Sequence, residues 1–392
     1  MSRPNILLIV TTRQHFALAE QAAMMPNLAA LAQGGVRYDG SYTCATASSS
    51  SRASILTGCY PTSHGLWADG ITLPSHNRLI GRVLGNAGYD CGHVGRLHLA
   101  PCENAQTEIR GNDGFTSFDW SHGPTNLSRQ NSFAGWLKEA DPKTYATVFS
   151  REFDVTRPDG TWSPEAGRTQ VEAAAQLAHL DWAAERAIAF VTAPRACPYF
   201  LSLGISAPEI VATTPGDTTP EPAVLERLDI AIGKVLAETD ENTLVIVTSD
   251  RGPGLPPHNT AIRVPLVLHW PANPRATACV RTEPVQSIDI AATIAEAARV
   301  GSIGQGLSLL GDRARSYALI WSGRSIILCE DGWKLVLTGT RARLFDLGAD
   351  PEETTDLAQT HAYAARLEDM TDRMIEHLME TEDRSARREA NW

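Results

Sequence analysis

The sequence lacks the long apolar runs and the excess of positive charge that mark membrane and nucleic-acid-binding proteins. No segment approaches the about 18 apolar residues of a membrane-spanning helix. The N-terminal apolar run, Ile6–Val10 with its flank, is too short for the hydrophobic region of a secretory signal peptide. A formal net charge of −11 disfavours a nucleic-acid or anionic-membrane surface. We therefore predict no membrane and no nucleic-acid partner.

Paired cysteines are also missing. The seven cysteines are scattered, and no two of them have the spacing of a metal-binding or redox CxxC motif. An odd, scattered set indicates thiols in a reducing compartment rather than a disulfide framework. The sequence therefore predicts a cytoplasmic protein.

What the chain does contain is enough apolar residues for a sizeable core. Of its 392 residues, 43% are hydrophobic and 20% are charged, which is ordinary for a soluble globular protein. This length suits one large α/β domain, or a large domain with a small one. No internal repeat divides the chain further.

The most informative stretch is Cys44–Gly65, which reads CATASSSSRASILTGCYPTSHG. Four serines, Ser48–Ser51, and Arg52 precede a short helical run, Ala53–Thr57, which Gly58 can end as a C-cap. Hydroxyls and a guanidinium near a helix N-terminus favour an anion there, and one of the serines is a candidate nucleophile. The local pattern alone also fits a flexible serine loop with an N-cap.

Apolar runs elsewhere predict a parallel sheet covered by helices. Three runs are typical of strands buried on both faces: Asn5–Val10, Pro198–Ile205 and Asn242–Asp250. Arg168–Val191 and Pro220–Glu238 carry apolar residues at helical spacing. Because function collects at the carboxyl ends of parallel strands, we expect residues 11–14 to line any site.

The C-terminal quarter has a different pattern. Four short runs predict a small antiparallel sheet: Ser316–Trp321, Ser325–Glu330, Trp333–Thr338 and Arg343–Asp346. A charged helix, His361–Arg388, is expected to close the chain with most of its charges in solvent.

The Cys44–Gly65 stretch resembles the signature of the sulfatases, within the alkaline-phosphatase-like superfamily. That signature is Cys or Ser, any residue, Pro or Ala, any residue and Arg, then a helix reading roughly A-S-L-L-T-G, then Y-P-x-x-H-G. The matching positions are Ser48, Arg52, Ala53–Gly58, Tyr60–Pro61 and His64–Gly65. Ser50 departs from the signature, since Pro or Ala is usual there. The resemblance implies catalytic roles for Ser48, Arg52 and His64.

The resemblance continues at the ends of two predicted strands. Sulfatases open with R-P-N-I-L-L-I-x-x-D-D, whose two aspartates bind a divalent metal. Arg3–Ile9 matches, but Thr12 and Arg13 stand at the aspartate positions. The segment Gly95–Leu99 resembles the family's G-K-W-H-L, in which the lysine and the histidine contact the sulfate. It carries Arg96 and His98 at those two positions, and His98 is a further catalytic candidate.

Two more family positions are replaced. Sulfatases have a P-H pair with the histidine in the sulfate pocket, and Glu209 stands at that histidine. The strand Asn242–Asp250 matches N-T-L-V-I-F-T-S-D, which makes Asp250 the counterpart of a metal ligand. Arg251 occupies the position of the next ligand, and residues 252–262 contain no lysine to match the family's second pocket lysine.

The resemblance implies an α/β fold, an alkaline-phosphatase-like α/β/α sandwich with a mostly parallel central sheet and a small C-terminal antiparallel sheet. We expect a core domain over residues 1–303 and an α+β subdomain over residues 304–392. Residues 100–165 form a variable insertion rich in Gly, Pro, Ser, Asn and aromatic residues. That insertion fits either substrate-facing loops or a solvent-covered excursion.

The replaced ligands predict a site without metal or cofactor. Of the family's ligands Asp250 alone is retained, and one carboxylate flanked by Arg13 and Arg251 does not suit Ca²⁺ or Mg²⁺. Guanidinium groups where the metal would lie predict an arginine-rich pocket for a sulfate, sulfamate or phosphate group. Random substitution in an inactive site is the alternative origin of these arginines. The predicted substrate-binding residues are Thr12, Arg13, Arg96, Glu209 and Arg251.

The state of Ser48 is a separate prediction. Some sulfatases mature this serine to formylglycine, but Ser50 breaks the pattern, so we do not expect formylglycine here. An unmodified serine attacks when a base deprotonates it, and His98, His64 or Glu209 is the candidate base.

Three functions remain open at this stage. The first is a metal-independent hydrolase or transferase that acts on a sulfuryl, sulfamoyl or phosphoryl group of a small anionic molecule. The second is an inactive sulfatase-fold protein that binds an anion or a partner. The third is an ordinary metal-dependent sulfatase, or a phosphonate or phosphate ester hydrolase, that holds Ca²⁺ or Mg²⁺. The sequence gives neither the organic part of a substrate nor the oligomeric state.

Overall fold

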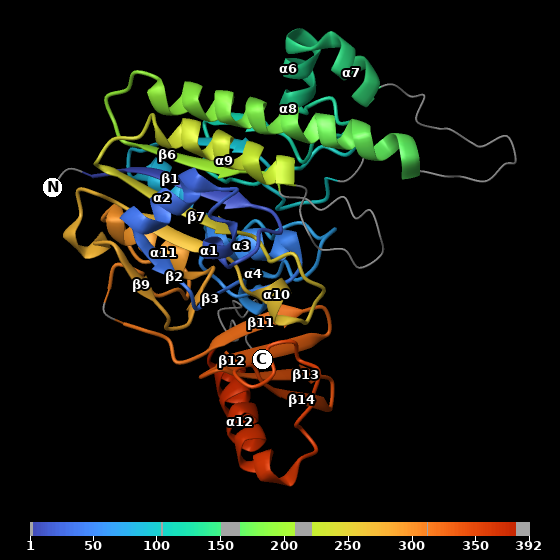
Figure 1. The fold of residues 1–392 in the computed structure, drawn as a ribbon. Coiled ribbons are helices and arrows are strands. Elements are labelled where there is room, and N and C mark those ends of the chain that lie inside the picture. The colour runs from blue at the N-terminus through green and yellow to red at the C-terminus, as the bar shows by residue number, and fades with distance from the viewer. Residues whose placement is uncertain (1–2, 103–104, 150–164, 208–221, 312, 382–392) are drawn as a thin grey trace, which may run out of the picture.

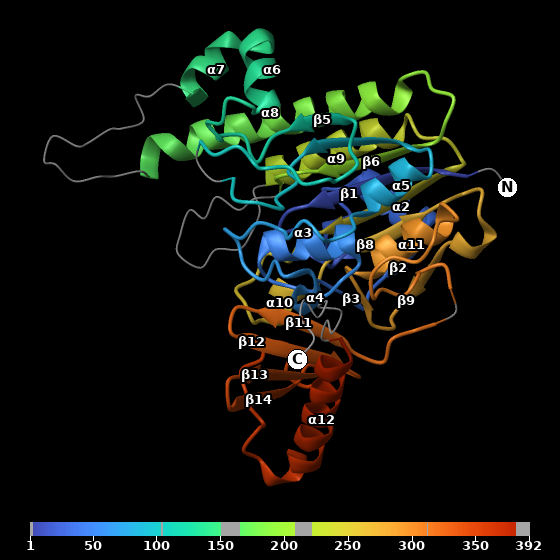
Figure 2. The same cartoon turned by 180° about the vertical axis from the view of Figure 1, so that it is seen from behind.

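The computed structural model describes residues 3–102, 105–149, 165–207, 222–311 and 313–381, with the backbone alone for 165–173 (Figure 1). Helices cover both faces of a large central sheet, and a smaller sheet lies beyond one of these layers (Figures 1 and 2). The predicted fold class is confirmed. The predicted boundary between residues 303 and 304 remains a prediction.

The central sheet has eight strands in the order β5-β4-β6-β1-β7-β8-β2-β9. The β5-β4-β6-β1-β7 part is parallel, as is the β2–β9 pair, whereas β8 runs antiparallel to both of its neighbours. The strands are β1 Asn5–Thr11, β2 Val36–Tyr38, β4 Asp90–Gly95, β5 Ser117–Trp120, β6 Tyr199–Gly204, β7 Thr243–Ser249, β8 Leu266–His269 and β9 Cys279–Arg281.

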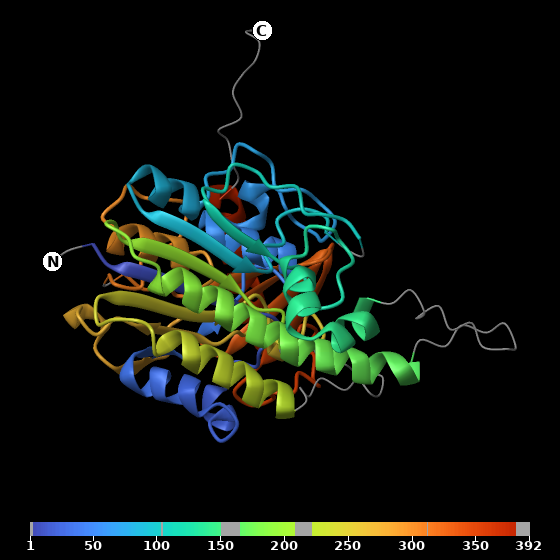
Figure 3. The same cartoon turned by 90° about the horizontal axis from the view of Figure 1, so that it is seen from above.

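Apolar residues on both faces of the sheet explain why its strands read as continuous apolar runs. Leu7 and Ile9 of β1 lie in one core, while Ile6 and Leu8 lie in the other, as the two-residue period of a strand requires. The first core is covered by α2 Pro26–Gly34, α6 Ser132–Ala140, α8 Glu165–Thr192 and α9 Pro222–Leu236, of which α8 and α9 run side by side (Figure 3). The second is covered by α3 Ser48–Thr57, α5 Ile80–Asn86 and α11 Asp289–Ala297.

The small C-terminal sheet is antiparallel, as predicted, with the order β11-β12-β13-β14. Its strands are β11 Ala318–Ser322, β12 Ser325–Glu330, β13 Trp333–Thr338 and β14 Arg341–Asp346. Met370 and Met374 of α12, Ala364–Thr381, pack on one of its faces. The backbone of Trp321 exchanges hydrogen bonds with Cys44 and Thr46, so this sheet supports the segment that leads into α3.

The remaining elements are short. They are α1 Leu18–Gln21, β3 Ser41–Tyr42, α4 Pro61–His64, α7 Pro142–Phe149, α10 Asn259–Ile262, η2 Pro274–Ala276, β10 Val285–Gln286 and η3 His361–Tyr363. The closing helix begins at Ala364 rather than at the predicted His361, because the chain first makes the 3₁₀ turn η3. Within the described residues, no helix combines the length and the apolar character needed to cross a membrane.

Candidate active site at the carboxyl edge of the sheet

Parallel pairing brings distant residues to one edge of the sheet. The strands β1, β4, β6 and β7 run in the same direction, so the residues that follow their carboxyl ends gather there. Thr12 and Arg13 follow β1, Arg96 follows β4, and Asp250 follows β7. This edge faces α3, which carries Ser48 and Arg52. Most of the site residues predicted from the sequence therefore lie together here.

The helix α3 begins earlier than the sequence suggested. Its first residue is Ser48, so the four serines are helical rather than a loop before Ala53. Ala47 supplies no side-chain cap; instead the Asp69 carboxylate accepts a hydrogen bond from the Ser49 N–H at 2.9 Å. A tertiary contact thus replaces the local cap that sequence rules look for. The predicted end is confirmed, because Gly58 has the left-handed φ of 70° that a glycine C-cap favours.

Ser48 occupies the first turn of α3. Its side chain is partly buried, and its hydroxyl makes no hydrogen bond to any residue that the structure describes. The first N–H groups of a helix have no intrahelical acceptor. An unengaged hydroxyl beside such groups is a suitable position for a nucleophile next to a bound anion.

Arg52 is buried and joins three strand ends. Its Nε donates to Asp250 Oδ2 at 3.0 Å, its Nη1 to the Arg96 carbonyl at 2.8 Å, and its Nη2 to Thr12 Oγ1 at 3.0 Å. Burial lowers the pKa of Arg52, and the Asp250 charge opposes this shift. Its planar fork is thus used inside the protein, not presented to an anion as the sequence suggested.

The close packing around Arg52 depends on a glycine. A Cβ at Gly204, the last residue of β6, would collide with the Arg96 carbonyl and press on Arg52 Nη1. Any larger residue there would displace the carbonyl that accepts from Arg52.

Asp250 is fully buried, and both of its oxygens have protein partners. Besides Arg52, Oδ2 accepts from Thr12 Oγ1 at 3.3 Å, and Oδ1 accepts from the Arg13 N–H at 3.4 Å. Arg13 takes a positive φ of 57°, which directs its N–H to this carboxylate. Ca²⁺ takes six to eight oxygen ligands and Mg²⁺ about six. One carboxylate bound by a guanidinium does not fit either ion.

Arg96 and His98 form the second part of the site. Both are nearly buried, and Arg96 Nε donates to the carbonyl of His122 at 2.5 Å. His98 has a left-handed φ of 61°, which is uncommon for a side chain of this size. Its Nε2 lies 3.8 Å from Asp69 Oδ1, next to the Ser49 N–H that the same oxygen accepts. The Asp69 carboxylate therefore lies between His98 and the first turn of α3.

Positive charge dominates this region. Burial, and then the charges of Arg96 and Arg52, lower the pKa of His98 to about 4. The same three causes, together with His98, lower the pKa of His122 well below its ordinary value. Burial raises the pKa of Asp69, but hydrogen bonding from Ser49 and the charges of His98 and Arg251 outweigh it, so this pKa is lowered. Arg251 therefore lies near enough to act on the same carboxylate.

Two predicted residues remain to be located. The Arg13 side chain is partly buried and makes no hydrogen bond or ion pair to the described residues. Glu209 lies outside the residues that the structure describes.

His64 lies behind α3, away from Ser48. Its Nδ1 accepts from the Leu66 N–H at 3.1 Å, so Nε2 carries the proton and donates to Ser54 Oγ at 3.1 Å. Ser54 is six residues beyond Ser48, about 9 Å along the helix. This geometry favours a structural role for His64, joining α3 to the turn after α4, over the predicted catalytic one.

The burial of His64 predicts acid sensitivity. Burial lowers the pKa of His64 to about 4 in the folded protein. The unfolded chain therefore binds a proton at this histidine below about pH 6.5, whereas the folded chain does so only near pH 4. The free energy of unfolding should fall as pH drops from 6.5 towards 4, by up to about 3 kcal/mol from this one group. Urea unfolding at pH 7, 5.5 and 4.5 measures this slope. His64→Gln should reduce this slope by the share of this one group, and the same slope in that variant would contradict the assignment; the exposed His76→Gln serves as the control.

Sequence reasoning missed three residues in the region of 100–165. Cys102 is fully buried, and its Sγ lies 2.9 Å from His122 Nδ1. The buried Glu108 accepts hydrogen bonds from the N–H groups of His98 and Leu99 and from the Trp120 indole. No local pattern marks these residues, because each acts on a partner 9 to 20 positions away.

Comparison with known proteins gives consistent matches. The family model described as Sulfatase matches residues 4–167 and 223–300. The sequence is 23% identical to an uncharacterized sulfatase, YidJ, of Escherichia coli K12, over 98% of this chain and 88% of that protein. It is also 23% identical to PehA of Trinickia caryophylli, described as a multifunctional alkaline phosphatase superfamily protein, over 98% and 97%.

The fold matches solved structures as well. A phosphonate monoester hydrolase of Agrobacterium radiobacter superposes with a TM-score of 0.74 at 17% sequence identity. The superposition covers 97% of this chain and 96% of that one. At this identity the match concerns the fold.

Proposed function

Because the chain belongs to the sulfatase family, we propose that it binds a sulfate-, sulfamate- or phosphate-type group at the first turn of α3 and acts on its ester there. The unengaged hydroxyl of Ser48 and the helix N-terminus support this position. Arg96 and Arg251 supply positive charge beside it, as the lowered pKa values of His98 and Asp69 indicate. The partner is a small anionic molecule.

One observation carries the further proposal that the site works without Ca²⁺ or Mg²⁺. The Arg52 guanidinium bonds to Thr12 and Asp250, two positions at which the sulfatase resemblance expects ligands of the metal. A cation of the protein itself thereby satisfies the buried Asp250 charge. A divalent ion would have to displace a guanidinium that has three partners in low dielectric, which is costly.

The residues at this edge suggest a displacement at sulfur or phosphorus. Ser48 Oγ would form the new bond while the ester oxygen leaves with the bonding electron pair. The Ser48 proton would pass to His98, which is neutral at pH 7 because its pKa is lowered to about 4. Water, or another acceptor, would then take the group from Ser48. Because a base with such a low pKa accepts a proton only weakly, we expect turnover to be slow.

A second candidate is a protein that binds the anion without acting on it. The bonds among Arg52, Asp250 and Thr12 are complete without any ligand, as expected for an edge kept for stability. Turnover separates this candidate from the first.

We also propose a cytoplasmic location. None of the seven cysteines is joined to another by a disulfide, and two of them, Cys197 and Cys279, are exposed. Exposed thiols support a reducing compartment.

Thermal melting tests the anion site. Sulfate or inorganic phosphate should raise the melting temperature of chelator-treated protein, because a ligand at 100 times its Kd adds about 2.7 kcal/mol to stability. Ca²⁺ and Mg²⁺ should leave it unchanged. Arg96→Met should remove the rise with sulfate, whereas the exposed Arg324→Met should keep it. A rise with Ca²⁺ or Mg²⁺ and none with either anion would contradict the proposal.

A further inference from the structure

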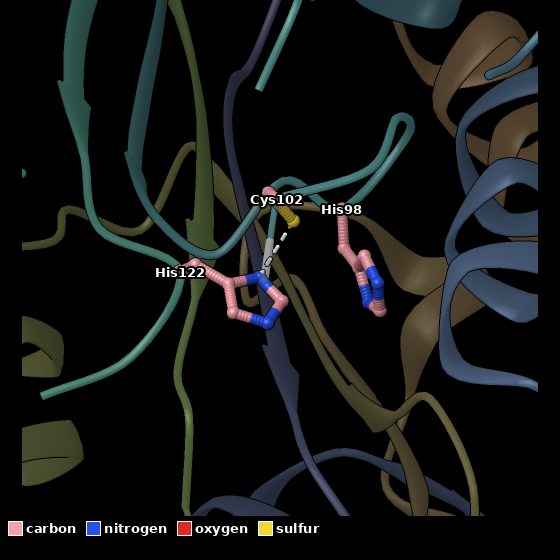
Figure 4. A group of neighbouring side chains, drawn as sticks. All are labelled: His98, Cys102 and His122. Carbon is pink, nitrogen blue, oxygen red and sulfur yellow. Dashed lines mark hydrogen bonds between the residues drawn. The ribbon is translucent and has the colours of Figure 1, made fainter. Parts of the chain in front are cut away.

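Three side chains beside the anion site form a group of which the proposed chemistry uses His98 alone. Cys102 Sγ and one ring nitrogen each of His98 and His122 lie within 4.8 Å of one another, and Figure 4 shows His98 and Cys102 on one loop and the His122 side chain reaching Cys102 from another segment. Within the described residues this is the one group of three or more His, Cys, Asp or Glu with ligand atoms this close. We propose that these residues form a binding site for a borderline-soft transition metal such as Zn²⁺.

The donor set fits zinc and excludes the hard ions. One thiolate and two imidazoles are ligands that Zn²⁺ and its neighbours in the first transition row prefer, whereas Ca²⁺ and Mg²⁺ take oxygen. Three protein ligands leave the fourth tetrahedral position open to water or a small ligand. The site thus differs in position and in chemistry from the Asp250 edge.

The distances are close to those that the metal needs. With Zn–S near 2.3 Å and Zn–N near 2.0–2.1 Å, neighbouring ligand atoms of a tetrahedral site lie roughly 3.3–3.6 Å apart. Cys102 Sγ and His122 Nδ1 are 2.9 Å apart, and no pair in the group exceeds 4.8 Å. The ligand atoms are therefore near the separations that a tetrahedral site needs.

His98 gives a second, independent observation. The residue is 7% exposed, yet neither ring nitrogen makes a hydrogen bond to the described residues. Nδ1 is buried without a partner, and Nε2 is 3.8 Å from the nearest carboxylate oxygen, on Asp69. A buried imidazole without hydrogen bonds is costly, since buried polar atoms nearly always have partners. A metal ion would supply the missing partner.

The surroundings hold His98 in place and moderate the charge. Glu108 accepts hydrogen bonds from the N–H groups of His98 and Leu99, which fixes the strained turn that carries the imidazole. The Asp69 carboxylate lies beside the ring, where an acceptor typically orients a metal-bound histidine. The thiolate, Asp69 and Glu108 offset the positive charges of Arg52 and Arg96.

This site does not depend on the proposed ester chemistry. Metal on a His98 nitrogen excludes that nitrogen from proton transfer, so the test is read from metal binding and not from turnover. Failure of metal binding leaves the anion site intact, and failure of the anion site leaves the metal site intact.

Titration with Co²⁺ and Zn²⁺ tests the site. The protein is the reduced, chelator-treated full chain in which the exposed Cys197 and Cys279 are serine. We expect one Co²⁺ per chain with a thiolate-to-cobalt charge-transfer band, displaced by Zn²⁺ but not by Ca²⁺ or Mg²⁺. Cys102→Ser should abolish the band, and His122→Ala should weaken Co²⁺ binding by about 10–100-fold or more.

Two results would overturn the proposal. One is Co²⁺ binding without a thiolate band, and the other is a band that survives in Cys102→Ser. Cys102 is fully buried, so its variant is first checked for folding by circular dichroism. If that variant does not fold, His122→Ala decides, because His122 is partly exposed. Unchanged Co²⁺ affinity in folded His122→Ala would then reject the site.

Discussion

Replacing Arg52 with methionine should destabilise the protein by about 3–5 kcal/mol, because the change leaves the Asp250 charge buried without its partner. Asp250 is 0% exposed, and Arg52 also supports the Arg96 carbonyl and Thr12 Oγ1. The loss should appear as a lower midpoint of denaturant unfolding with an unchanged slope.

A double variant separates the charge from the packing. Asp250→Asn removes the stranded charge while keeping a side-chain oxygen for the Arg13 N–H. Arg52→Met with Asp250→Asn should therefore recover at least about 1 kcal/mol relative to Arg52→Met alone. A single Arg52→Met variant within about 1 kcal/mol of the wild type would refute the buried pair.

Replacing Ser48 with alanine should abolish turnover while sulfate binding persists. The hydroxyl is the proposed nucleophile, and losing a nucleophile lowers kcat by about 10³-fold or more. Stability should change little, because this hydroxyl makes no hydrogen bond to the described residues. Turnover of an aryl sulfate and an aryl phosphonate ester, measured beside the sulfate-induced rise in melting temperature, tests both parts.

Ser50→Ala is the matched control. Its hydroxyl lies in the same turn of α3, is buried, and has no hydrogen-bond partner among the described residues. Removing an unsatisfied hydroxyl should cost little, and turnover should survive. Equal loss of turnover in both variants would mean that the substitutions disturb the helix α3, and that Ser48 is not the nucleophile.

Much of the fold was readable from local pattern. The Asn5–Val10 run predicted a strand buried on both faces, and β1 has one core on each side. Gly58 predicted the end of α3 because a left-handed C-cap is a property of one residue. The four strands of the small sheet were also predicted from local pattern, because each is a short apolar run bounded by turn residues.

For the candidate active site, the sequence predicted which residues belong to it but not the contacts that these residues make. The sequence offered Arg52 as a fork for an anion, but its partners lie 40, 44 and 198 residues away and use the fork inside the protein. It likewise missed the start of α3, because the Ser49 N–H is capped by Asp69, 20 residues on. Contacts at such separations depend on the register of the sheet, which no local pattern contains.

Turnover by chelator-treated protein, with and without Ca²⁺ or Mg²⁺, tests the central claim most directly. The substrates are aryl sulfate, sulfamate, phosphate and phosphonate esters, chosen for the group that reacts. The account predicts slow turnover of at least one ester, unchanged by either ion and lost in Ser48→Ala. Turnover that appears only when Ca²⁺ or Mg²⁺ is restored would contradict it, because the Arg52 guanidinium would then have yielded its position to a metal.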